Sequence, residues 1–182
     1  MPANIHIRPA RPDDAPAIAA IYAPHVTDDV VSFEERPPDA AEMARRMAAG
    51  GALHPWLAAE FDGRVAGYAY AGPFRTRAAY AWAVETTVYV AGDAQGRGVG
   101  RALYARLLDL LTRQGFAQAV GIIALPNDAS VRLHERLGFR RIGVNERVGW
   151  KHGRWIDVGL WQRPLAETTG DPAPPRPFAD VI

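Results

Sequence analysis

The chain has 182 residues, and its 21 Lys and Arg residues nearly balance its 20 Asp and Glu residues, leaving a formal net charge of +1. Like charges form no block, so a nucleic-acid-binding surface has little support. Cysteine is absent, which excludes disulfides, thiolate nucleophiles and cysteine-ligated metals. With no signal-like apolar core and no apolar run of bilayer length, the sequence predicts a cytoplasmic protein without a metal.

The first half of the chain predicts two helices set between short strands. Asp62-Gly63 is typical of the tight turn of a β-hairpin, and two glycines after residue 49 predict a helix end. Alternating apolar residues mark the strands, and apolar residues at helical spacing mark the helices. The expected elements are a strand near residues 5–7, helices over 11–22 and 39–51, and strands over 56–61, 64–72 and 81–90.

The second half contains the strongest helical pattern of the chain. Residues 99–115 carry four leucines at the helical period, and Gly115 predicts the helix end. The order β-α-α-β-β-β-α-β-α-β-β predicts one mixed α/β domain over residues 1–165. Residues 166–182 are rich in proline and predict a loosely packed tail. The other expected elements are a strand over 117–125, a helix over 126–139, and a hairpin of 140–149 with 154–163.

A glycine-rich segment, QGRGVGRAL, lies between the strand over 81–90 and the long helix. Glycine at this density disfavours a helix, but it lets a ligand approach the backbone where free N–H groups and the helix dipole attract anions. The Lys and Ser/Thr of a Walker A loop are missing, and Leu103 stands where the dinucleotide fingerprint needs glycine. The remaining pattern, Gln95-x-x-Gly98-x-Gly100, indicates a phosphate site, unless it is an ordinary loop capping a helix.

This pattern resembles the pyrophosphate-binding signature of the GNAT N-acetyltransferase superfamily. The segments ETTVYV, LPNDASVRLHERLGF, GWKHGRWIDVGLWQ and PPRP are similar to the phosphinothricin N-acetyltransferase branch, in the same order. The resemblance implies a twisted, mostly antiparallel sheet flanked by helices, acetyl-CoA as co-substrate, and a homodimer. It assigns acetyl-CoA binding to Val88, Tyr89, Val90, Gln95, Gly96, Arg97, Gly98, Val99, Gly100, Arg101, Asn127 and Ser130.

Two residues are candidates for proton transfer. Glu85 matches a glutamate of the family and is the candidate base, against the alternative of a structural carboxylate paired to an arginine. Asn127, Ser130 and His134 share one helix face, with Asn127 as the expected cap. By resemblance, His134 lies near the sulfur and donates or relays a proton; the alternative is a histidine that only packs there.

The resemblance also implies a pocket for a small amino acid with an anionic tail. Its expected residues are Phe33, Arg75, Arg77, Tyr80 and Tyr89. Arginine suits a carboxylate or phosphinate, although a solvated loop is the alternative for the two arginines. Methionine sulfoximine or sulfone offers similar oxygens, so these compounds remain alternative substrates for acetylation.

Other functions on the same fold remain open. One is acetylation of protein N-termini, which the paired arginines and an enclosed aromatic pocket disfavour. Another is a non-catalytic acyl-CoA sensor, which Glu85 and His134 disfavour. Trp150, Trp155 and Trp161 either serve a dimer interface or fill the core.

Overall fold

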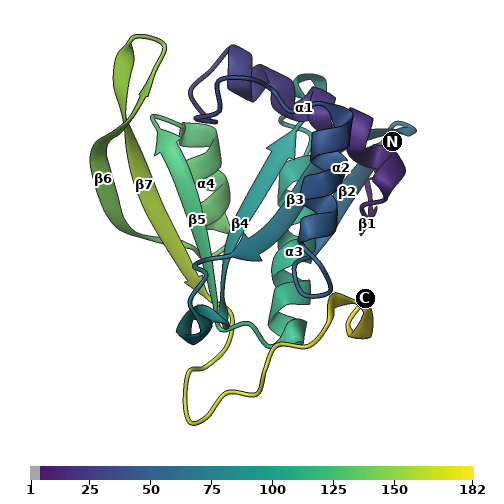
Figure 1. The fold of residues 1–182 in the computed structure, drawn as a ribbon, viewed down its shortest axis with the longest axis vertical. Coiled ribbons are helices and arrows are strands. Elements are labelled where there is room, and N and C mark those ends of the chain that lie inside the picture. The colour runs from purple at the N-terminus through teal and green to yellow at the C-terminus, as the bar shows by residue number, and fades with distance from the viewer. Residues whose placement is uncertain (1–4) are drawn as a thin grey trace.

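The computed structural model describes residues 5–182, and its central feature is a seven-stranded sheet (Figure 1). The strand order is β1-β2-β3-β4-β5-β7-β6, and every neighbouring pair is antiparallel except β4 with β5. The element order and the mostly antiparallel sheet confirm the sequence prediction. The elements are β1 Ile5–Pro9, α1 Ala15–Thr27, α2 Ala40–Ala49, β2 Trp56–Phe61, β3 Arg64–Pro73, β4 Ala83–Val90, α3 Val99–Gln114, β5 Gln118–Leu125, α4 Asp128–Arg136, β6 Arg140–Lys151 and β7 Arg154–Pro164.

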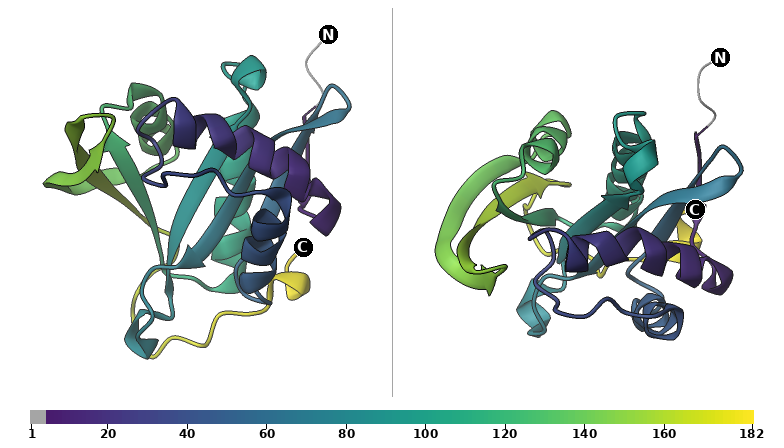
Figure 2. Two further views of the ribbon diagram at one scale, coloured as in Figure 1. Left: turned by 45° about the horizontal axis from the view of Figure 1, so that its top comes forward. Right: turned by 90° about the horizontal axis from the view of Figure 1, so that it is seen from above.

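Helices cover both faces of the sheet. The right view of Figure 2 shows α3 and α4 on one side and α1 and α2 on the other. The main core lies under α3, where its leucines at the helical period are at most 1% exposed. A second core packs α1 against Met43 of α2 and Tyr68 of β3. The leucines that repeat at the helical period in the sequence therefore form the face by which α3 packs against the sheet.

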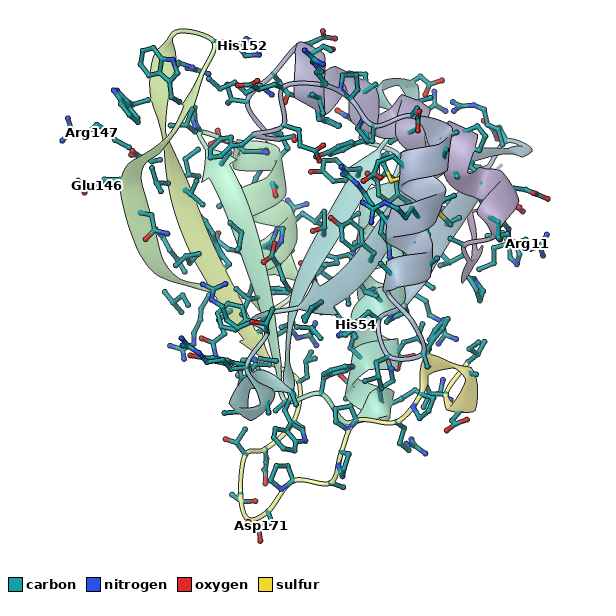
Figure 3. All side chains as sticks on the ribbon, in the orientation of Figure 1. Arg11, His54, Glu146, Arg147, His152 and Asp171 are labelled. Atoms are coloured by element: carbon teal, nitrogen blue, oxygen red, sulfur yellow. The ribbon has the colours of Figure 1, made fainter. Side chains whose placement is uncertain are left out.

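The proline-rich tail is exposed over residues 166–174, in line with the loose packing expected from its composition, but its end packs against the domain. Val181 is 1% exposed and belongs to the main core. The buried Gln114 side chain donates to the carbonyl groups of Leu53 and Arg176, both at 2.9 Å. Figure 3 labels Asp171 at the outer bend of this tail, and the Trp82 indole nearby donates to the carbonyl oxygen of Ala173 at 2.8 Å. Backbone carbonyl groups and one buried valine thus anchor a segment whose composition alone indicates flexibility.

The β6–β7 hairpin extends beyond the rest of the sheet, as the labels of Glu146, Arg147 and His152 mark in Figure 3. Trp161 is buried in the main core. Trp150 and Trp155 are 60% and 58% exposed and pack edge to face with ring centroids 5.2 Å apart. Of the three tryptophans, only Trp161 fills the core, and the other two form an exposed aromatic pair.

Candidate active site

The site begins where β4 and β5 separate. The two strands pair in parallel over three positions only, from Ala83 with Gln118 to Glu85 with Val120. Figure 1 shows the strands diverging above this point, with α4 beside β5. From Thr86 onward, β4 pairs with β3 alone, so its other edge presents free backbone groups to the opening. Cavities of about 520 and 550 Å³ occupy the opening.

The glycine-rich turn lies at one end of the opening and is built to receive an anion. Gly96 and Gly98 have φ values of 73° and 87°, a left-handed conformation that favours glycine. Gly98 is the N-cap of the 16-residue α3, and no side chain caps the first N–H groups of the helix. A Cβ on Gly100 would lie 3.3 Å from Val90 Cγ2, so glycine also keeps α3 close to β4. Free N–H groups and the helix dipole together fit a phosphate group.

Most of the residues predicted to bind acetyl-CoA line the 550 Å³ cavity. Arg97 is the exception, because its guanidinium lies over the Phe61 ring at 5.7 Å and does not line the cavity. The cavity reaches from the glycine turn along β4 to the N-terminus of α4, a path suited to an elongated ligand with a phosphate at one end. The predicted residues that line it are Val88, Tyr89, Val90, Gln95, Gly96, Gly98, Val99, Gly100, Arg101, Asn127 and Ser130.

The candidate base Glu85 is half-buried and lines the 520 Å³ cavity. Burial raises the pKa of its carboxyl group, and the positive charge of Arg75 partly opposes this effect. Among residues 5–182, Glu85 forms no ion pair, so the alternative of a structural carboxylate paired to an arginine gains no support. A half-buried carboxylate with a raised pKa is a stronger base than an exposed one, which suits it to accept a proton.

The Asn127, Ser130 and His134 face of α4 forms as predicted. The Asn127 side chain accepts a hydrogen bond from the Ser130 backbone N–H at 3.1 Å, which confirms it as the helix cap. His134 is 4% exposed and touches the 520 Å³ cavity. Its Nδ1 lies 2.8 Å from the Ser130 carbonyl oxygen, and its Nε2 lies 2.9 Å from the Tyr104 hydroxyl. Burial lowers the pKa of the imidazole, so the neutral form is favoured.

The residues predicted to bind the amino acid divide into two groups. Phe33 and Tyr89 line the 520 Å³ cavity. Arg75, Arg77 and Tyr80 lie in the exposed loop before β4 and do not line that cavity. The guanidinium of Arg75 covers the ring of Phe74 at 4.4 Å, so this loop presents a cation beside the site.

The sequence did not reveal a network that closes the other side of the cavity. Tyr22 of α1 donates to Glu34 at 2.8 Å and also lies 2.6 Å from the Ser32 hydroxyl oxygen. Arg46 of α2 donates twice to Glu34, at 2.7 and 2.9 Å, and holds the pKa of that carboxyl below its usual range. Glu34 is therefore charged and paired, which leaves Glu85 as the carboxylate free to take up a proton. No sequence spacing links these residues, because they come from two helices and a loop.

Within residues 5–182, no group of three His, Cys, Asp or Glu side chains is arranged to hold a metal ion. No helix in that range has both the length and the apolar character needed to span a bilayer.

Comparisons with known proteins agree with the geometry. A family model described as an acetyltransferase (GNAT) domain matches residues 7–160. A phosphinothricin N-acetyltransferase from Streptomyces viridochromogenes is 44% identical over 97% of this chain and 94% of its own. An L-methionine sulfoximine/L-methionine sulfone acetyltransferase from Pseudomonas paraeruginosa is 36% identical over 91% of this chain and 98% of its own.

A solved structure is similar over almost the whole chain. The crystal structure of a GNAT superfamily phosphinothricin acetyltransferase from Sinorhizobium meliloti in complex with acetyl-CoA has a TM-score of 0.89 and 40% identity. It covers 95% of this chain and 94% of its own. That protein binds acetyl-CoA on the same fold.

Proposed function

This chain belongs to the GNAT acetyltransferase family, and from that premise we propose that it acetylates the α-amino group of phosphinothricin or a close amino acid analogue. The observation that carries the proposal is the placement of Glu85, a half-buried carboxylate beside the strand opening that leads to the glycine turn. Acetyl-CoA supplies the acetyl group as a thioester.

The chain's own backbone holds the co-substrate. The N–H groups after Gly98 at the start of α3 bind phosphate, and Gly96 and Gly98 allow the close approach. The free edge of β4 from Thr86 to Val90 offers backbone groups to an extended arm, as a sheet edge does to an added strand. The same edge offers N–H groups to polarise the thioester carbonyl.

Glu85 removes a proton from the substrate ammonium and so generates the nucleophilic amine. The C–N bond then forms and the C–S bond breaks, the nitrogen loses a second proton, and the sulfur takes up one. Arg75 and Arg77 lie in the loop next to the site and bind the anionic ends of the amino acid. Arg75 is close enough for its charge to lower the pKa of Glu85.

The test measures thiol release from acetyl-CoA with L-phosphinothricin, methionine sulfoximine, methionine sulfone, glutamate and a peptide amine. Phosphinothricin is expected to have the highest kcat/KM. Glu85→Gln is expected to lower kcat by about 10²-fold or more while acetyl-CoA still binds. Glu146→Gln, on the exposed hairpin, is the matched control and should keep full activity.

The outcomes separate the possible functions. A preference for methionine sulfoximine or sulfone would keep the reaction and change the substrate. Turnover of the peptide amine alone would refute the small-molecule pocket. Acetyl-CoA binding without turnover of any amine would favour a sensor and refute the proposal.

We also propose a cytoplasmic homodimer that gives its host resistance to such analogues. The exposed Trp150–Trp155 pair supports the dimer, because large aromatic rings at 60% and 58% exposure are unusual on a free surface and enriched at interfaces. Replacing both tryptophans by serine should shift the mass measured by light scattering from dimer to monomer. Fractionation of the host should recover the protein with the cytoplasm, and deleting the gene should raise sensitivity to the analogue.

A further inference from the structure

A chain of buried hydroxyl groups connects His134 to the point where β4 and β5 separate. Tyr104, on α3, is 0% exposed, and its hydroxyl oxygen lies 2.9 Å from His134 Nε2. The same oxygen lies 2.7 Å from Thr86 Oγ1. Thr86 Oγ1 in turn lies 3.2 Å from the Val120 carbonyl oxygen, a second acceptor toward which its hydroxyl can turn. Three side chains from three elements therefore form one continuous hydrogen-bonded path.

One end of this path is fixed by a carbonyl group. His134 Nδ1 lies 2.8 Å from the Ser130 carbonyl oxygen, which only accepts, so Nδ1 carries a hydrogen. In the neutral imidazole, Nε2 is then the acceptor, the Tyr104 hydroxyl donates to it, and Thr86 donates to the Tyr104 oxygen. Neither ring nitrogen is left free to point at a ligand. A direct proton transfer from His134 to the sulfur does not fit this arrangement.

The path is also complete when His134 is protonated. Nε2–H then donates to the Tyr104 oxygen, Tyr104 donates to Thr86, and Thr86 donates to the Val120 carbonyl oxygen, which ends the chain as a pure acceptor. Each hydroxyl group needs only to rotate, and no side chain has to move. Both protonation states therefore keep every hydrogen bonded.

The other end of the path borders the reaction site at Thr86, which is itself 3% exposed. Thr86 is the first β4 residue beyond the last parallel pair, Glu85 with Val120, and it lines the 520 Å³ cavity with Glu85 and His134. The backbone makes room for the path, because a Cβ on Gly121 would lie 2.6 Å from both Cδ2 and Nε2 of His134. The missing side chain at residue 121 allows the imidazole to lie against β5.

We propose that Thr86 and Tyr104 relay one proton between the reaction site and His134, which stores it during acetyl transfer. The proposal rests on the proposed acetyltransferase function. A proton released at the amine reaches Thr86 Oγ1, Thr86 passes its own proton to Tyr104, and Tyr104 passes its own to Nε2. The reverse sequence returns one proton to the departing thiolate. Each step breaks one O–H or N–H bond and forms another, so no further reactant is needed.

Few charges influence this path. Burial raises the pKa of the Tyr104 hydroxyl strongly. The charge of Arg163 on β7 lowers this pKa and the charge of Glu85 on β4 raises it. Around His134, the effects on its pKa come from burial and from the Ser130 carbonyl on its own helix. The ring of Phe139 lies against both aromatic rings, with centroids 5.5 Å from Tyr104 and 5.1 Å from His134. In this apolar site, the hydroxyl groups of Tyr104 and Thr86 therefore supply the hydrogen bonds that stabilise a protonated His134.

Two isosteric variants test the relay. Tyr104→Phe and Thr86→Val each remove one hydroxyl. Thr112→Val is the control, because Thr112 is an exposed residue of α3 whose hydroxyl donates only to the Leu108 carbonyl one turn earlier. Nitrogen-15 NMR of His134 should show hydrogen on Nδ1 in the neutral form. Tyr104→Phe should lower the pKa of His134 by about one to two pH units, because an imidazolium loses its acceptor. Thr112→Val should leave that pKa unchanged.

Kinetics provide the second readout. Each relay variant should lower kcat by about 10- to 100-fold while changing the KM for acetyl-CoA by less than about 2-fold. The double variant should be no slower than the slower single variant, since the two hydroxyls act as a unit. Additive losses, or an unchanged pKa of His134 in Tyr104→Phe, would overturn the relay.

The two readouts keep this proposal distinct from the proposed function. The NMR titration needs no substrate, so it tests the path even if the wild-type protein acetylates none of the amines. Thr86→Val provides a kinetic test if Tyr104→Phe does not fold. Full kcat in Thr86→Val together with active wild-type protein would refute the relay and leave the acetyltransferase function intact.

Discussion

Gly121→Ala is the sharpest test of how His134 is held. Gly121 lies in the middle of β5, where a larger residue would favour the strand, yet the imidazole of His134 occupies the space above it. A Cβ there would lie 2.6 Å from Cδ2 and Nε2, whereas ordinary contacts begin at 3.4 Å. A single methyl group must therefore displace the ring or the strand.

The size of the effect follows from this overlap. Overpacking a well-packed core costs about 1–3 kcal/mol. For a chain of this length, about 2–4 °C is lost per kcal/mol, so the midpoint of thermal unfolding should fall by about 2–12 °C. If the ring moves to relieve the overlap, Nε2 leaves the Tyr104 hydroxyl, and kcat should fall as it does in Tyr104→Phe.

Differential scanning calorimetry and thiol-release kinetics measure the two effects. Gly143→Ala is the matched control, because a Cβ on Gly143 meets no atom within 4 Å. In the background of His134→Ala, the stability cost of Gly121→Ala should almost vanish, which gives a coupling energy of about 1–3 kcal/mol. A Gly121→Ala protein with unchanged stability and kcat would show that the ring does not lie against β5, and the reasoning about His134 would fail.

Three more predictions concern the base, the cap and the tail. Burial raises the pKa of Glu85, and only its deprotonated form can act as the base, so kcat/KM should rise with pH around a pKa above 4.5. Glu85→Gln should abolish this rising limb of the pH–rate profile. Asn127→Ala should lower the free energy of unfolding by about 1 kcal/mol, measured in urea, while Asn127→Asp, which still caps, should stay within about 0.5 kcal/mol of wild type. A chain ending at residue 170 loses the buried Val181 and should unfold with a midpoint lower by at least about 4 °C; an unchanged midpoint would mean that the tail does not pack as described.

The elements of the fold could be read from local patterns. Gly115 ends α3 with a φ of 92°, and Asp62 and Gly63 both have positive φ in the turn between β2 and β3. Such signals depend on neighbouring residues, so sequence alone reveals them. The helix that starts near residue 15 continues to Thr27, past Pro24, because its inner face is buried against Met43 and Tyr68. Tertiary packing, which has no local signal, decided that boundary.

The candidate site divides in the same way. The glycine turn and the α4 cap are local, and both lie where the sequence predicts. Glu34 and Tyr104 are invisible to spacing, because the partner that gives each its role lies on another element: Arg46 for Glu34 and His134 for Tyr104. The tail illustrates the same limit of sequence-based prediction. Gln114 donates to the backbone carbonyl group of Arg176, and every residue type has such a carbonyl, so the sequence does not reveal this contact.

The early separation of β4 and β5 explains why these features come together. Three parallel pairs are enough to align the strands, and the region beyond them leaves a backbone edge, a cavity and Thr86 at one point. Longer pairing would satisfy the β4 backbone and bury Glu85 away from any ligand. The strand opening therefore weakens the sheet locally while it creates the cavity, the base and the entrance to the proton path. If this is correct, substitutions that extend the pairing should stabilise the fold and lower activity together.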